Sequence, residues 1–281
     1  MDAFAKEMSK KGYVEGKNLT IEWRYANGDY AVLPELAAEI VRMNVDLIVT
    51  NSLPSTLAAQ RATKSIPIVF AILLDPVGSG VTSSLARPDG NATGQSLMSI
   101  DTVSKQIELL AVIVPRLARI AVLVNPKVPI HAEFLKHAQV AGQQVGAKVF
   151  PVEASTPEDL ERGFKSIVNA HAQAVIIASD SFFGSRSSQI ARLALEHRVA
   201  SIFPYGADAE SGGLLSYGPD LQNSYRRAAE YVDKIFKGAK PIDLPIEQPT
   251  IFQFMINLKT AKALGIKIPQ ELFLRADRVI E

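Results

Sequence analysis

The stretch from Asp46 to Gly80 constrains the fold most, because it alternates two short apolar runs with a helical run. Residues 46–50 and 66–72 are apolar and rich in β-branched side chains, which is typical of strands buried on both faces of a parallel sheet. Residues 54–63 are expected to form the crossover helix between them, and such crossovers are right-handed in nearly all proteins. The stretch therefore predicts a β–α–β unit of a doubly wound sheet.

The same alternation continues on both sides of this unit. Further strands are predicted at 19–25, 92–98, 119–124, 148–152, 174–178, 200–203, 214–217 and 250–256. Helices are predicted at 2–11, 31–43, 77–86, 102–113, 131–145, 157–168, 185–197, 221–237 and 257–265. A chain of 281 residues with 47% apolar content is long enough for two cores. We therefore expect an α/β protein with two doubly wound, parallel-sheet lobes.

Three segments, near residues 97, 214 and 247, are expected to connect the lobes. Lobe 1 then comprises 1–97 and 215–246, and lobe 2 comprises 98–214 and 247–281. Three connections, with a ligand cleft between two sheets, are the architecture of a hinge-bending binding protein. The helix expected at 2–11 has no strand before it, whereas a doubly wound domain normally opens with one. We therefore expect the first strand of lobe 1 to be missing from this chain.

Composition and motifs argue against several classes of function. Thirty basic and 29 acidic residues leave a net charge of +1, so no nucleic-acid partner is expected. The chain has no cysteine, which excludes disulfides and thiolate chemistry. No nucleophile elbow, zinc-protease motif or Walker A sequence is present, and Gly78–Ser83 has serine where a dinucleotide loop has its last glycine. We therefore expect no catalytic residue and no cofactor.

Aromatic and imidazole side chains outside the strand ends receive a structural interpretation. The four histidines do not pair at metal-ligand spacing, so we expect no metal site and interpret each as a solvated helical residue. They are His131, His137, His171 and His197. Trp23 and Tyr25 lie on a predicted strand and are interpreted as packing residues.

Polar and aromatic residues follow the strand ends of both lobes, where open α/β sheets bind their ligands. In lobe 1 they are Asn51, Ser52, Ser55, Thr56, Asp75 and Pro76, and in lobe 2 they are Asn125, Ser179, Asp180, Phe182 and Tyr205. Each has a local explanation as a helix cap or a turn residue. Together, however, they can converge on a cleft, and their chemistry suits an amino acid.

Each part of an amino-acid ligand has candidate partners in this set. The free amide groups of Ser55 and Thr56, at a helix N-terminus, are expected to bind a carboxylate. Asp75 or Asp180 is expected to bind an ammonium group. Phe182, Phe183 or Tyr205 is expected to contact an apolar or aromatic side chain.

Long runs covering nearly the whole chain resemble the ABC-transporter substrate-binding proteins of the tryptophan or aromatic amino-acid type. They are GYVEGKNLTIEWRYANGDYAVLPELAAEIV, IPIVFAILLDPVGSGVTSSLARPDGNATG, GGLLSYGPDLQNSYRRAAEYVDKIFKGAKPIDLPIEQPTIFQFMINLKTAKALGI and LRADRVIE. Asp75-Pro76, Asn51-Ser52 and Ser179-Asp180 match polar strand ends of that family. The resemblance implies a type I periplasmic-binding-protein fold, no enzymatic activity, and delivery of a small ligand to an ABC permease. Characterised relatives are associated with tryptophan, phenylalanine or tyrosine.

The resemblance also implies a periplasmic protein, and we expect a monomer. Family members normally begin with a signal peptide and a strand, and we expect both to be missing from this chain. Two other functions remain open from the sequence. A ligand-sensing regulator would share the fold, and an enzyme would use the cleft. A signal peptide upstream would favour transport, a helix-turn-helix would favour regulation, and the absence of a nucleophile–base pair argues against an enzyme.

Overall fold

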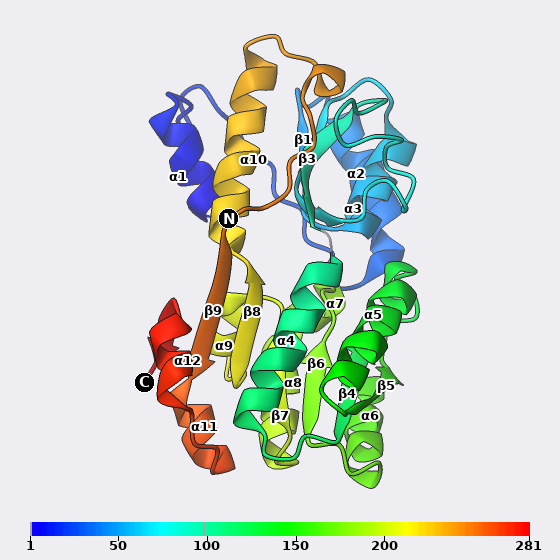
Figure 1. The fold of residues 1–281 in the computed structure, drawn as a ribbon. Coiled ribbons are helices and arrows are strands. Elements are labelled where there is room, and N and C mark those ends of the chain that lie inside the picture. Colours follow the sequence, from blue (N-terminus) through cyan, green and yellow to red (C-terminus); the bar gives the residue numbers. More distant parts are fainter. Residues whose placement is uncertain (1, 98) are drawn as a thin grey trace. The chain divides into compact units, whose positions relative to one another are not determined.

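The computed structural model describes residues 2–97 and 99–281 and divides into two units (Figure 1). Unit 1 is formed by the chain up to residue 98 and by Asp220–Ile251. Unit 2 is formed by Ser99–Pro219 and Phe252–Glu281. Both units combine parallel strands with helices, as the sequence predicts. No helix within the described ranges is long and apolar enough to cross a membrane.

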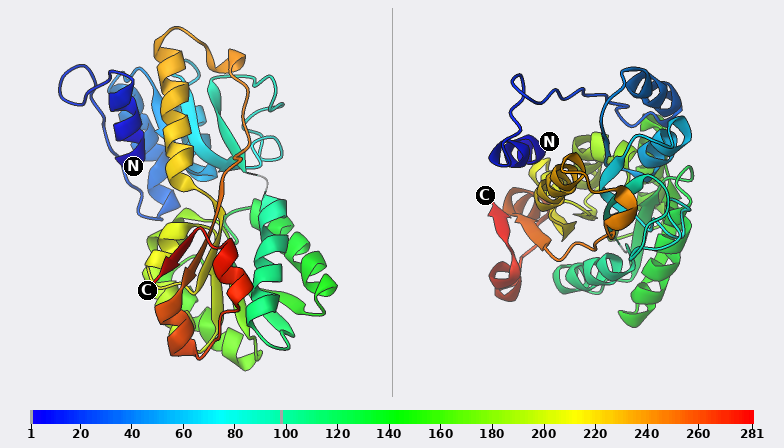
Figure 2. Two further views of the ribbon diagram at one scale, coloured as in Figure 1. Left: turned by 60° about the vertical axis from the view of Figure 1, so that its left-hand side comes forward. Right: turned by 90° about the horizontal axis from the view of Figure 1, so that it is seen from above.

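Unit 1 contains a parallel three-stranded sheet of order β1-β2-β3. The strands are β1 (Ile48–Thr50), β2 (Ile68–Leu74) and β3 (Ala92–Leu97). The helices are α1 (Asp2–Lys10), α2 (Leu33–Arg42), α3 (Leu53–Ala62) and α10 (Leu221–Phe236), with 3₁₀ turns at Tyr30–Val32 and Pro241–Asp243. Helices α2 and α3 pack on one face of the sheet, and α1 and α10 pack on the other, where Figure 2 shows them side by side. Strand β2 is buried on both faces because apolar residues of these helices pack against each face of the sheet.

Two expectations for unit 1 are wrong. Residues 20–26 form no strand, since Leu19 makes an isolated bridge to Glu15 and the three strands of the sheet lie elsewhere. Residues 77–86 form turns instead of a helix. The carboxylate of Asp89 accepts hydrogen bonds from the hydroxyl of Thr82 and the backbone N–H of Ser83, both at 2.7 Å. Such side-chain bonds to a loop compete with helix formation.

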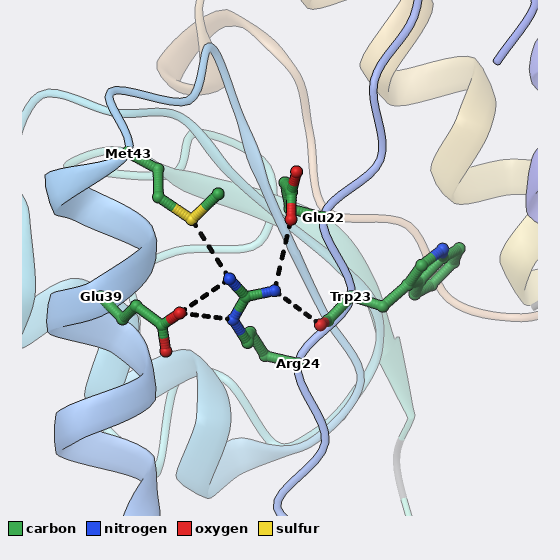
Figure 3. Close-up of polar contacts among 5 residues, drawn as sticks. All are labelled: Glu22, Trp23, Arg24, Glu39 and Met43. Atoms are coloured by element: carbon green, nitrogen blue, oxygen red, sulfur yellow. Dashed lines mark hydrogen bonds and ion pairs between the residues drawn. The ribbon is translucent and has the colours of Figure 1, made fainter. Parts of the chain in front are cut away.

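The segment 20–26 is held to α2 by Arg24 (Figure 3). Its guanidinium donates to Glu39 from Nε at 2.9 Å and from Nη2 at 2.7 Å. It also donates to the carbonyl oxygen of Trp23 at 2.9 Å, and Met43 Sδ lies 3.4 Å from Nη2. The segment is thus attached to α2 by the side chain of Arg24, and not to the sheet by backbone hydrogen bonds.

Unit 2 contains a seven-stranded sheet of order β10-β9-β8-β7-β6-β4-β5. Its strands are β4 (Arg119–Val124), β5 (Lys148–Glu153), β6 (Ala174–Ile177), β7 (Ala200–Phe203), β8 (Leu215–Pro219), β9 (Phe252–Asn257) and β10 (Arg278–Ile280). The five strands from β5 to β8 are parallel, as predicted. Strand β9 is antiparallel to β8, and β10 is parallel to β9. The sequence analysis did not predict β10 or the change of direction.

Helices cover both faces of this sheet, and each face has its own apolar core. One face packs against α4 (Ser99–Ile113), α5 (Ile130–Gln144), α11 (Leu258–Leu264) and α12 (Gln270–Arg275). The other packs against α6 (Pro157–Asn169), α7 (Ser181–Ser185) and α8 (Ser187–Glu196), and a short helix α9 (Gly206–Glu210) follows β7. The helix expected at 185–197 therefore begins earlier and is divided at Arg186. Asp180 caps α7 and starts the helical run before Ser185.

The unit boundaries differ from the expected lobe boundaries by a few residues at two crossings. Residues 215–219 lie in unit 2 because β8 forms ladders with both β7 and β9. Residues 247–251 lie in unit 1, where Glu247 pairs beside β3. The first expected crossing, near residue 97, adjoins residue 98, which lies outside the described residues.

Candidate functional site

The sheet of unit 2 reverses its strand order between β4 and β6. Strand β5 lies on one side of β4, and β6 lies on the other. Ligands of open α/β sheets bind at such a switch point, beyond the carboxyl ends of the strands. Asn125 follows β4 directly, and Ser179 and Asp180 follow β6. The structure therefore brings three of the residues selected from the sequence to the switch point, and Tyr205 follows the next strand, β7.

These four residues form two hydrogen-bonded pairs. The side-chain amide of Asn125 donates to Asp180 Oδ2 at 3.2 Å, and its Oδ1 accepts the backbone N–H of Lys127 at 3.0 Å. The hydroxyls of Ser179 and Tyr205 lie 2.5 Å apart. Asn125 is only 1% exposed, whereas Asp180 and Tyr205 are half-buried. The cluster thus presents a carboxylate held by the buried Asn125 and a phenol held by the half-buried Ser179.

His131 is a member of this cluster that the sequence analysis missed. It lies in the first turn of α5, is 3% exposed, and contacts both strand ends. Burial lowers the pKa of its imidazole, although the carbonyl oxygen of Ser179 and the charge of Asp180 act in the opposite direction. The interpretation of His131 as solvated is therefore wrong. Its helical spacing to the buried Phe134 and Ala138 was the signal that could have identified it.

Asp180 and Phe182 have structural roles at the start of α7. Asp180 Oδ1 accepts the backbone N–H groups of Phe182 at 2.7 Å and of Phe183 at 3.1 Å. The rings of Phe182 and Phe183 lie in the core beneath the helix, with exposures of 5% and 1%. Tyr205 is therefore the more accessible aromatic residue of this group.

Asp208 is a second residue of this region that the sequence analysis missed. It lies in α9, three residues after Tyr205, and is buried. Burial raises the pKa of its carboxyl to about 7, against hydrogen bonds from the Tyr205 backbone and the Ser187 side chain. A carboxyl that titrates near neutral pH thus lies next to the backbone of Tyr205.

In unit 1, the structure brings Asn51 to a tyrosine that the sequence analysis did not select. The exposed Asn51 donates from Nδ2 to the hydroxyl of Tyr225, on α10, at 3.2 Å. Burial raises the pKa of Tyr225, and Tyr25 adds to the rise, whereas the hydrogen bond from Asn51 opposes it. Residues from three separate segments therefore meet beyond β1.

The amide groups of Ser55 and Thr56 are not free, contrary to the expectation. The N–H of Ser55 donates to Ser52 Oγ at 3.4 Å, and the N–H of Thr56 donates to the carbonyl oxygen of Ser52 at 3.0 Å. The hydroxyl of Thr56 is buried and lies 2.8 Å from that of Thr50. Ser52 is thus the N-cap of α3, and the local explanation of these residues is confirmed.

Asp75 forms a turn that its own carboxylate stabilises. Oδ1 accepts the backbone N–H of Gly78 at 2.9 Å, and the backbone of Asp75 has a positive φ of 39°. A Cβ atom on Gly78 would lie 2.0 Å from Asp75 Oδ2, so this approach requires glycine. Pro76 is buried in the same turn. Asp75 and Pro76 therefore have the local role that Asp-Pro sequences commonly have.

Trp23 and Tyr25 are exposed, so their interpretation as packing residues is wrong. Their side chains are 37% and 55% exposed and stack at 6.3 Å with an interplanar angle of 8°. Arg24 lies between them in the sequence, and its side chain is hydrogen-bonded to Glu39 on α2 (Figure 3).

Among residues 2–97 and 99–281, no group of His, Asp and Glu side chains is arranged to hold a metal ion.

Comparisons with known proteins give a consistent result. A "Tyrosine-binding protein" from Clostridioides difficile strain R20291 is 29% identical over 270 residues, which cover 94% of this chain and 76% of that protein. A crystal structure of a conserved domain protein from Vibrio cholerae matches with a TM-score of 0.91 and 27% identity, over 99% of this chain and 93% of the other. The ABC domain of Streptococcus pneumoniae in complex with L-Trp matches over the same shares, with a TM-score of 0.90 and 22% identity, and shows likeness of fold alone.

The family model described as "ABC transporter substrate binding protein" matches residues 1–280. Proteins of this family bind solutes, catalyse no reaction and are extracytoplasmic, so the regulator and the enzyme are less supported alternatives. The fold of the two units agrees with this assignment. The chain therefore belongs to the ABC transporter substrate binding protein family.

Proposed function

We propose that this chain is the receptor of an ABC importer for an amino acid with an aromatic side chain, which it delivers to a permease in the membrane. The cluster at the switch point of unit 2 is the observation that carries this proposal. Asp180 offers a carboxylate that Asn125 holds, and Tyr205 offers a half-buried aromatic ring. Similarity to a tyrosine-binding relative supports the choice of ligand.

Asp180 is the proposed partner of the ligand's ammonium group. The amides of Asn125, Phe182 and Phe183 donate to its two oxygens and hold the carboxylate in place. An ammonium group forms charge-assisted hydrogen bonds with a carboxylate, and these are stronger than neutral ones. Asp75 is a weaker candidate because it stabilises its own turn. The ring of Tyr205 is proposed to contact the aromatic side chain.

Unit 1 is proposed to bind the ligand's carboxylate. The side-chain amide of Asn51 has a second N–H besides the one bonded to Tyr225, and it precedes the N-terminus of α3, where the helix dipole favours an anion. We propose that both units contribute to one ligand site and that binding draws them together by rotation about the three connecting segments. The protein is further proposed to act in the periplasm as a monomer.

Isothermal titration calorimetry with a panel of ligands tests this function. The panel consists of L-tyrosine, L-tryptophan, L-phenylalanine, L-leucine and 4-hydroxyphenylpropionate, which lacks the ammonium group. We expect one or more aromatic amino acids to bind with 1:1 stoichiometry and the other two compounds to bind at least tenfold more weakly. A wild-type protein that binds none of the aromatic amino acids contradicts the proposed ligand class.

The variant Asp180→Asn tests the role of the carboxylate. It retains an oxygen for capping α7 but removes the charge, so we expect at least a tenfold loss of affinity, since an unpaired ligand charge costs about 2–5 kcal/mol. Asp243→Asn, an exposed change in the 3₁₀ turn Pro241–Asp243, is the matched control. Equal affinities of wild type and Asp180→Asn would exclude Asp180 as the ammonium partner.

A further inference from the structure

His131 differs from the other three histidines because it is buried, whereas they are partly or fully exposed. Its ring stacks against Phe183 at a centroid distance of 6.4 Å and an interplanar angle of 10°. By contrast, His137, six residues further along α5, is partly exposed and lies 3.7 Å from Glu133. His131 therefore sits inside unit 2, with one ring face on the core beneath α7 and its two nitrogens directed to strand ends.

Two hydrogen bonds specify the protonation state of this ring. The backbone N–H of Asn125 donates to Nδ1 at 2.9 Å, so Nδ1 carries no proton. The proton of a neutral imidazole then resides on Nε2, which donates to the carbonyl oxygen of Ser179 at 3.0 Å. One neutral ring thus joins the end of β4 to the end of β6, across the switch point.

We propose that neutral His131 is a positioning residue of the ligand site, which holds Asn125 and Ser179 in register so that Asp180 and Tyr205 face the ligand. The proposal rests on the proposed function. A proton on Nδ1 would place two donors, Nδ1–H and the Asn125 N–H, against each other and break that bond. Ligand binding therefore weakens when His131 becomes protonated at low pH.

The charged groups and the burial of the ring determine the pH range in which His131 becomes protonated. The β6–α7 connection presents the carboxylate of Asp180, which favours protonation, and β4 presents backbone groups. On α5 itself, Glu133 lies against His137. Burial is the largest effect, and it holds the pKa of His131 below its ordinary value of 6.5. The ring is therefore neutral at neutral pH, and the loss of binding is expected below pH 6.5.

Asp208 titrates in the same region and has to be separated from His131. Its pKa of about 7 means that it gains a proton before His131 does as the pH falls. All measurements are therefore made in pairs, in the wild type and in the Asp208→Asn background. A pH-dependent change that is absent from Asp208→Asn is due to the titration of Asp208. A change that persists in Asp208→Asn can be assigned to His131.

Two substitutions and one control test the proposal. His131→Gln can accept from Asn125 and donate to Ser179 but does not titrate, whereas His131→Phe can do neither. His137→Gln is the control on the same helix. The affinity for L-tyrosine or L-tryptophan is measured by calorimetry from about pH 5 to about pH 8, and folding is checked by circular dichroism.

We expect the wild type and His137→Gln to lose up to about tenfold in affinity as the pH falls below 6.5, from the loss of a buried hydrogen bond. His131→Gln should bind as the wild type does at neutral pH and show no such loss. His131→Phe should bind about tenfold more weakly at every pH while remaining folded. An unchanged pH profile in His131→Gln, or wild-type affinity in folded His131→Phe, overturns the proposal.

A second readout needs no ligand and separates this inference from the proposed function. In ¹H–¹⁵N spectra of the ligand-free protein, the amide signals of Asn125 and Tyr205 should move with pH below 6.5 in the wild type and stay fixed in His131→Gln. Amide signals that move alike in both proteins overturn the positioning role. If the spectra behave as expected but no aromatic amino acid binds, the proposed ligand class fails and the positioning role stands.

Discussion

Replacing Asp208 by asparagine should change how the stability of unit 2 depends on pH. Asp208 is 7% exposed, and burial raises the pKa of its carboxyl from 3.8 to about 7. One pKa unit corresponds to about 1.4 kcal/mol, so the rise represents about 4 kcal/mol of preference for the protonated form in the folded state. Asparagine has nearly the same shape and carries no charge at any pH.

The sign of the effect follows from proton linkage. The folded-state pKa lies above the unfolded-state value, so the folded protein binds one more proton between pH 3.8 and about 7. Its contribution to stability is fully present below the unfolded pKa and is lost as the pH rises through about 7. Between about pH 5.5 and about pH 8, the wild type should therefore lose about 2 kcal/mol that Asp208→Asn does not lose.

Urea unfolding at these two pH values measures the difference. Circular dichroism is the appropriate signal because Trp23, the single tryptophan, lies in unit 1 and Asp208 lies in unit 2. Other titrating groups contribute equally to both proteins and cancel in the comparison. Glu158→Gln, an exposed change in the first turn of α6, should follow the wild type. Equal pH dependence of wild type and Asp208→Asn would show that the buried carboxyl does not titrate as the structure indicates.

Three further substitutions test the packing of the two units by urea unfolding. Phe164→Ala should cost unit 2 about 3–5 kcal/mol, because this ring is fully buried between α6 and the sheet, and a cost below about 1 kcal/mol would contradict that packing. Gly94→Ala should destabilise unit 1 by more than about 2 kcal/mol, since its Cβ would lie 2.0 Å from the carbonyl oxygen of Phe70; wild-type stability would refute the close approach. Arg24→Ala should leave global stability nearly unchanged, because its ion pair with Glu39 is solvent-screened, but should speed amide exchange at residues 22–25; unchanged exchange there would show that another contact holds the segment.

The sequence predicted elements well where local pattern and tertiary packing agree. The strand expected at 119–124 is β4, and the one expected at 200–203 is β7, because both are short, largely apolar runs buried on both faces. The residues expected at 19–25 alternate apolar and polar side chains, which also favours a strand, yet they form none. A strand requires a neighbour for its ladder hydrogen bonds, and a pattern in one segment cannot report whether that neighbour is present.

The residues that meet at the switch point of unit 2 could be selected from the sequence, but their contacts could not. Strand ends can be located from the chain order of the elements, so Asn125, Ser179, Asp180 and Tyr205 were found. His131 was missed because only the folded chain shows that its two nitrogens reach different strands. The roles of Ser55 and Thr56 were wrong for a similar reason, since Ser52 accepts both of their amide groups. Whether a backbone amide is already hydrogen-bonded within the protein depends on side-chain rotamers and local geometry. Residue type alone does not determine these.

Hydrogen–deuterium exchange with and without ligand tests most directly the claim that both units contribute to one site for an aromatic amino acid. The ligand-free protein is compared with the protein saturated with L-tyrosine or L-tryptophan, and exchange is followed by mass spectrometry of peptides. We expect protection in unit 2 around Asn125, Ser179–Phe183 and Tyr205, together with protection in unit 1 around Asn51–Thr56. Bound ligand that protects only one unit, or neither set of strand ends, would contradict the account.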